Sequence, residues 1–193
     1  MPAAAFLAAA LLAAAPAVSF EGPLQVRNQF PLFISLDAPY LESAAVQDSA
    51  TVSLSYSSVY VTQSSADWTV NMDFEMTELM VRLKKELNER TEVGVDIPFY
   101  RVTEGFLDEP LAKFHSALGT GDYGRSARPY NEFLYEVIHQ GKPVIKPVVH
   151  QSGVGDVRLT AKRVLHDGGP LVSVQANVEA PTGDAKQGYG NGS

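Results

Sequence analysis

The 193-residue sequence contains no cysteine and carries little positive charge: 15 lysine and arginine residues stand against 22 aspartate and glutamate residues, a net charge of −7. Without cysteine there is no disulfide framework, no cysteine-ligated zinc site and no thiol nucleophile. An acidic chain without a local cluster of lysine and arginine is repelled by the negatively charged phosphate backbone of nucleic acids. We therefore expect no nucleic-acid partner.

Long apolar runs are also scarce, and the clear one lies at the N-terminus. Residues 1–15 are apolar and uncharged, and small residues follow at Ala17 and Ser19. This run is shorter than the ~20 residues of a membrane helix, and the pattern is typical of a secretory signal peptide. We predict a signal peptide over residues 1–19 and a periplasmic lead-in or plug segment over residues 20–50. A cysteine-free exported chain favours the Gram-negative envelope.

Alternation of apolar and polar residues is abundant, which is typical of strands with one apolar and one polar face. It predicts five strands, at residues 51–61, 68–86, 93–97, 156–165 and 171–180. The alternation changes phase near Thr77 and Glu78, and such a change is what a β-bulge produces. A helix over residues 76–88 is the alternative, because several good helix formers lie there.

The connections between the predicted strands alternate in length. Short turns lie at 87–90 and 166–169, whereas residues 100–152 form a long irregular segment with a predicted helix over 105–118. Outer-membrane barrels have short periplasmic turns and longer external loops, and a tilted membrane strand needs about 9–11 residues. We predict an all-β fold: a partial antiparallel up-and-down transmembrane β-barrel with about five strands, covering residues 51–193, and a long loop carrying one short helix.

Charges of both signs on the polar faces favour the barrel, since ion pairs can cross a narrow lumen. The residues predicted to line that lumen are Glu78, Arg82, Asp96, Arg158, Lys162 and Glu179. Because a soluble sandwich alternates in the same way, the alternative is a soluble periplasmic or secreted β-sandwich that binds a ligand through residues 100–152. In the barrel, the helix over 105–118 either packs on the rim or acts as a constricting plug, and its apolar stripe favours the rim.

Motifs for chemistry are weak. Residues 119–124 fit G-x-G-x-x-G but lack the preceding strand and following helix of a dinucleotide site, so we predict a loop. No serine has the G-x-S-x-G context, and the histidines at 115, 139, 150 and 166 lack the spacing of metal ligands. We expect no catalytic residue, no cofactor and no metal, and hence a protein that is not an enzyme.

Short motifs follow one another along the chain: Gly22–Leu32, Asp73–Glu75, Asp96–Phe99, Gly105–Asp108, Phe114–His115, Gly124–Arg125, Ser152–Asp156 and Glu179–Gly183. In this order they resemble a family of uncharacterised bacterial outer-membrane β-barrel proteins, a domain of unknown function. The last two are also similar to motifs of outer-membrane channels linked to the degradation of aromatic compounds, in the meta pathway for phenol.

The resemblance implies a location in the cell outer membrane. It also implies a passive channel for small or hydrophobic molecules as the role. The partners expected from it are outer-membrane lipid, the barrel assembly and export machinery, and a small-molecule solute. It implies a barrel with more strands than these residues supply, and an open sheet would leave unpaired edges in lipid. We therefore expect the chain to be the N-terminal part of a longer barrel.

Overall fold

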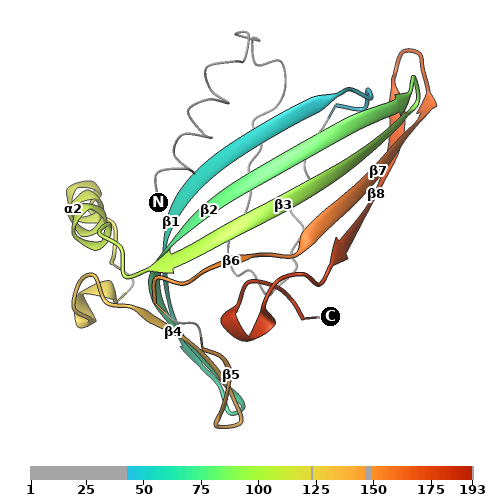
Figure 1. The fold of residues 1–193 in the computed structure, drawn as a ribbon. Helices are drawn as coiled ribbons and strands as arrows, with labels where there is room; N and C mark the ends of the chain where they lie inside the picture. Colours follow the sequence, from blue (N-terminus) through green and yellow to red (C-terminus); the bar gives the residue numbers. More distant parts are fainter. Residues whose placement is uncertain (1–42, 123, 147–148, 193) are drawn as a thin grey trace, which may run out of the picture.

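The structure, a computed structural model, describes residues 43–122, 124–146 and 149–192. In this part, eight strands form one antiparallel sheet that curls into a half-barrel (Figure 1). The strands are β1 Ser49–Ser64, β2 Trp68–Asn88, β3 Thr91–Thr103, β4 Leu134–His139, β5 Lys142–Ile145, β6 Ser152–Val154, β7 Val157–His166 and β8 Val172–Ala180. The helix α2 Asp108–Leu118 and two 3-10 helices, η1 Arg125–Ala127 and η2 Ala185–Gln187, complete these ranges. The predicted all-β class is confirmed.

Five strands form an up-and-down meander, in which β1 pairs with β2, β2 with β3, β3 with β7 and β7 with β8. These are the five strands predicted from alternation. The tight turns β2–β3 and β7–β8 lie together at one end of the sheet, which we call the turn end (Figure 1). The long connection from β3 to β7 leaves from the opposite end, the loop end.

The segment 100–152 is more ordered than predicted, because β3 continues to Thr103 and β4, β5 and β6 lie within the segment. One edge of β2 has two partners: residues 68–73 pair with β4, and residues 75–88 pair with β3. The missed strands are short, at six, four and three residues. Alternation over so few residues does not stand out from a loop, and the neighbouring strand supplies their order.

Strand β2 runs for 21 residues, so the alternative of a helix over 76–88 is wrong. The bulge predicted near Thr77 is also wrong. The register of β1 on β2 is unbroken from Ser49–Lys84 to Ser64–Thr69, and the β2–β3 register shifts only between Glu86 and Asn88. An unbroken strand keeps its alternation of faces. The change of phase therefore means that each face of β2 changes polarity along its length.

On the outer face, this change of polarity falls in the same row on three neighbouring strands, where Tyr56 pairs with Thr77 and Thr77 with Arg101. We call this row the polarity boundary. Toward the turn end, the outer, convex face is apolar and the inner, concave face is polar, apart from Met80, Pro98 and Tyr100 close to the boundary. Toward the loop end both assignments reverse: the outer face carries Ser58, Asp73, Glu75 and Thr103, and the inner face carries Val59, Met72, Phe74 and Val102.

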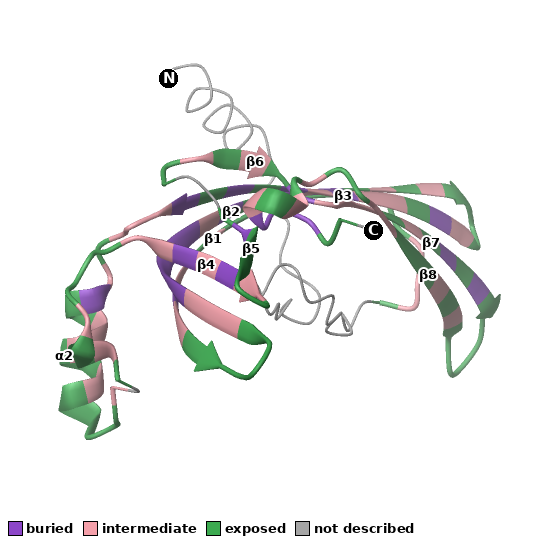
Figure 2. Cartoon of the chain, turned by 90° about the horizontal axis from the view of Figure 1, so that it is seen from below, coloured by how far each residue is buried: buried purple, intermediate pink, exposed green. Residues whose placement is uncertain are grey.

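The apolar part of the outer face continues across all five strands of the meander. It consists of Val52, Leu54, Tyr56, Leu79, Val81, Leu83, Leu87, Val93, Val95, Ile97, Phe99, Leu159, Val174 and Val178, and we call it the outer apolar band. Near the turn end the same face also carries Arg163 and Lys85, which pairs with Asp48. Much of it is open to solvent: Leu54 is 72% exposed and Val178 is 65% exposed. Buried and exposed residues alternate visibly along these strands (Figure 2).

Helix α2 lies outside the curve of the sheet, whereas the described C-terminal segment, residues 181–192, lies inside it (Figure 2). The predicted helix is confirmed with a later start, because Gly105 has a φ of 73° and lies before the helix. Gly119 ends α2 in a left-handed conformation and Gly124 precedes η1, so these two glycines of the 119–124 motif serve the loop that was predicted.

The predicted signal peptide and most of the lead-in segment fall on residues 1–42, outside the described residues. No helix in residues 43–122, 124–146 and 149–192 is both long enough and apolar enough to span a membrane.

Candidate functional site

Charged side chains of alternating sign cross the inner face in one row. Arg82 of β2 pairs with Asp96 of β3, Asp96 with Arg158 of β7, and Arg158 with Glu179 of β8. Directly paired residues of antiparallel strands point to the same face, with Cβ atoms about 4.5–5.5 Å apart. Four neighbouring strands therefore present a positive, negative, positive and negative charge in order, and we call this row the charge ladder.

The contacts within the charge ladder are direct and shielded from solvent. Arg82 Nε and Nη2 donate to Asp96 Oδ1 and Oδ2 at 2.8 and 2.7 Å, a two-bond geometry that fixes the guanidinium plane. Arg158 Nη2 donates to Glu179 Oε1 at 2.6 Å. The side chains of Arg82 and Asp96 are only 5% and 9% exposed. Charges this shielded are tolerated because each has a partner.

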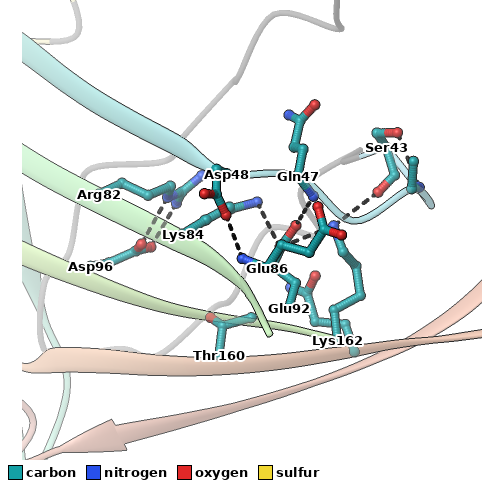
Figure 3. Close-up of polar contacts among 12 residues, drawn as sticks. Ser43, Gln47, Asp48, Arg82, Lys84, Glu86, Glu92, Asp96, Thr160 and Lys162 are labelled. Carbon is teal, nitrogen blue, oxygen red and sulfur yellow. Dashed lines mark hydrogen bonds and ion pairs between the residues drawn. The ribbon is translucent and has the colours of Figure 1, made fainter. Parts of the chain in front are cut away.

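A second ionic group lies beside the ladder, nearer the turn end (Figure 3). Glu92 Oε1 lies 3.0 Å from Lys162 Nζ and 3.7 Å from Lys84 Nζ. Glu92 Oε2 accepts a hydrogen bond from the backbone N–H of Gln47 at 2.9 Å, and Lys162 Nζ donates to the carbonyl oxygen of Ser43 at 3.2 Å. The segment that leads into β1 is therefore held against the inner face by these charges.

All six residues predicted from the sequence to be lumen-lining lie on the inner face: Glu78, Arg82, Asp96, Arg158, Lys162 and Glu179. Five of them belong to the two ionic groups, and Glu78 is buried on the same face in the row next to the polarity boundary. The prediction missed Glu92 and Lys84. A signal for both was present, because Lys84 lies two positions from Arg82 and Glu92 lies four positions from Asp96, so each shares the face of a predicted residue.

The polar wall is closely packed around the charge ladder. The cavity between the ladder and the neighbouring residues Lys84, Gly94 and Thr160 has a volume of about 10 Å³, room for no more than about one water molecule. Thr160 Oγ1 donates to Asn177 Oδ1 at 3.0 Å, which joins β7 to β8 on the same face. The ladder is therefore a fixed polar surface.

At the polarity boundary and beyond it, the inner face carries the hydrophobic core, which is rich in aromatic rings. Phe74 stacks on Tyr135 with ring centroids 4.5 Å apart, and Tyr100 stacks on Tyr189 of the C-terminal segment at 6.1 Å. Burial raises the pKa of the Tyr189 hydroxyl to about 12. The hydroxyl is therefore neutral near pH 7 and donates to the carbonyl oxygen of Gln151 at 3.0 Å.

Two sequence motifs near the C-terminus, 152–156 and 179–183, pack against each other. Asp156 Oδ1 accepts the backbone N–H of Gly183 at 2.9 Å, and Thr182 Oγ1 donates to the carbonyl oxygen of Gly155 at 2.8 Å. A Cβ atom on Gly155 would lie 2.4 Å from the ring of Tyr100, so only glycine fits there. The two motifs thus hold the C-terminal segment over the aromatic end of the inner face.

No three His, Asp or Glu side chains within the described ranges are arranged to hold a metal ion. The inner face instead presents fixed ion pairs toward one end and aromatic rings toward the other. Ion pairs interact with polar or charged solutes, and aromatic surface interacts with apolar ones.

The model of a protein family described as "Protein of unknown function (DUF3187)" matches residues 3–193. The charge ladder, the polarity boundary and helix α2 all lie within the match. No curated protein and no solved structure gives a significant match.

Proposed function

Given that the chain belongs to the DUF3187 family of proteins of unknown function, we propose that it forms part of an outer-membrane β-barrel and is exported through a signal peptide. The observation that carries this proposal is the polarity boundary, where the outer face of three strands changes from apolar to polar in one row, and close to which the inner face changes from polar to apolar. The wall of a membrane barrel has an apolar outer face and a polar inner face at the level of the hydrocarbon. Outside the hydrocarbon, its outer face need not be apolar. The boundary then marks the level at which the wall leaves the lipid.

The outer apolar band supports the same proposal. Soluble monomers rarely expose a contiguous apolar patch of more than a few hundred Å², whereas this band crosses five strands. Strands β7 and β8 have 10 and 9 residues, close to the about 9–11 residues that a tilted membrane strand needs. In the described part, β1 and β8 each pair with one strand only. The unpaired backbone groups of an open sheet edge are not tolerated in lipid, so the proposal includes further strands that close the sheet.

The proposed role is a passive channel for small or hydrophobic molecules. The charge ladder would set ion preference. The similarity of two motifs to those of channels linked to aromatic-compound degradation favours an aromatic solute.

Charge reversal in the ladder is expected to change conduction. Arg158→Glu places a third acid between Asp96 and Glu179, so the cation preference of single channels of the full-length protein in planar bilayers should rise severalfold. The control is Arg163→Glu, the same change on the outer face of β7, which should leave ion preference as it was. Unchanged current and ion preference in Arg158→Glu would count against a lumen lined by the ladder.

The location is tested by fractionation and gel migration of the full-length protein. We expect it in the outer-membrane fraction, soluble only with detergent. An unheated sample should migrate differently from a boiled one, because a closed barrel keeps its backbone hydrogen bonds in detergent. Folded protein recovered from the aqueous periplasmic fraction without detergent would contradict the proposal.

A second candidate function is ligand binding by a soluble envelope β-protein through residues 100–152. A cavity of about 600 Å³ lies between α2 and β1, lined among others by Tyr60, His115 and Tyr130. Small-molecule sites range from about 300 to 1,000 Å³, so the size is suitable. The fractionation experiment separates the two candidates.

A further inference from the structure

Helix α2 is fixed to the outer face just beyond the polarity boundary. Arg125 Nη1 lies 2.8 Å from Asp73 Oδ2 of β2, and the same guanidinium pairs with Asp108 in the first turn of α2. Glu75 Oε1 accepts a hydrogen bond from the backbone N–H of Phe106 at 2.9 Å. Because Asp73 and Glu75 belong to the outer face, these bonds place the start of the helix against the outside of the wall.

Apolar side chains extend from the outer apolar band onto this helix. Tyr56, the band residue of β1 at the polarity boundary, stacks on Phe106 with ring centroids 5.5 Å apart. Phe106 is 63% exposed, and Phe114 and Leu118, one turn apart on α2, are 57% and 60% exposed. A surface of large apolar side chains therefore crosses the boundary and continues along the helix.

The other sides of α2 differ in character. Glu109 and Lys113 form an exposed ion pair at 2.7 Å, one turn apart. Leu111 and His115 line the cavity of about 600 Å³ that separates the helix from β1. The side of α2 that faces the sheet borders this cavity, and neither Phe114 nor Leu118 lines it. Within residues 43–122, 124–146 and 149–192, Phe114 is therefore left largely uncovered.

We propose that α2 is an interfacial helix whose Phe114 and Leu118 side, together with Phe106 just before the helix, inserts into the lipid surface beside the barrel. This inference rests on the proposed function. Such helices lie in the interface with their apolar side buried about 5–10 Å, and aromatic residues are enriched at that depth in membrane proteins. The lipid bilayer is the occupant because the apolar side of α2 continues the band that faces hydrocarbon, at the level where the wall leaves it.

The experiment measures tryptophan quenching in vesicles of phosphatidylcholine that is brominated near the headgroup end of the acyl chains. These 193 residues contain one tryptophan, so Trp68→Phe, with any tryptophan of the further strands also changed to phenylalanine, supplies a tryptophan-free background. Into it go Phe114→Trp on the apolar side of α2 and, as matched control, Lys113→Trp on the polar side. A third variant, Leu83→Trp, reports on the outer apolar band. Phe114→Trp should lose roughly half of its emission relative to unbrominated vesicles, as expected for a side chain at the acyl boundary, and Lys113→Trp should lose little.

The outcomes distinguish the helix from the barrel. If Leu83→Trp is quenched and Phe114→Trp behaves like Lys113→Trp, the interfacial helix is wrong and the membrane barrel stands. If none of the three is quenched, both proposals fail. Equal strong quenching of Phe114→Trp and Lys113→Trp would overturn the orientation assigned to α2.

Discussion

Leu83→Arg is expected to destabilise the protein in a bilayer by about 2–4 kcal/mol, the cost of a cationic side chain on the lipid face near the midplane. Leu83 lies in the outer apolar band of β2, midway between Leu79 and Leu87, and is 46% exposed. In water, a surface substitution of this kind changes stability by no more than about 0.5 kcal/mol. The free energy of unfolding in phospholipid vesicles, from urea titration, therefore separates a lipid-facing wall from a soluble one.

Leu87→Arg is the matched control, because the same substitution is made on the same strand and face. Leu87 lies next to the β2–β3 turn, where an arginine near the membrane interface costs about 0–1 kcal/mol. A much larger loss of unfolding free energy for Leu83→Arg than for Leu87→Arg indicates that Leu83 lies deeper in the lipid. Equal and small effects at both would mean that this face meets water.

Glu92→Gln is expected to lower the free energy of unfolding by about 3–5 kcal/mol, since removing one member of a buried ion pair leaves the other charge uncompensated. The Glu92 side chain is 1% exposed and that of Lys162, 3.0 Å away, is 3% exposed. Urea or thermal unfolding of the refolded protein measures the loss. Glutamine keeps the shape of the side chain, so the loss reports on charge.

The double variant Glu92→Gln with Lys162→Met should recover part of the lost stability, because the buried charge of Lys162 is then removed as well, whereas Lys84, 3.7 Å from Glu92, keeps its charge. Glu109→Gln is the exposed control: its pair with Lys113 lies on the surface of α2, and such helix pairs contribute about 0.3–0.5 kcal/mol. If Glu92→Gln cost no more than Glu109→Gln, the second ionic group would be solvated and the inner face would not shield its charges.

The alternation of residues 172–180 was enough to predict both the strand β8 and its polar face. Side-chain period alone fixes which residues share a face, and so the inner-face position of Glu179 was also predictable. The pairing of Glu179 with Arg158 was not, because it depends on register. A slip of one residue would move every charge of a strand to the opposite face. The residues of the turns do not predict which residues of two neighbouring strands pair.

The change of phase near Thr77 shows a different limit. A bulge and a reversal of polarity along an unbroken strand give the same local pattern. Only the neighbouring strands separate them, since the outer faces of β1 and β3 reverse polarity in the same row. Glu92 was missed for a simpler reason: it is the second residue of β3, directly after a turn, where a charged residue is ordinarily a solvated one.

The two partners along one edge of β2 have a consequence for the order of assembly. Residues 75–88 pair with β3, which follows immediately in the chain, whereas residues 68–73 pair with residues 134–139. Closing a short loop costs less entropy than closing a long one, and local contacts form sooner than distant ones. We expect the β2–β3 hairpin to form first. Residues 68–73 of β2 then have unpaired backbone groups along this edge until β4 pairs with them.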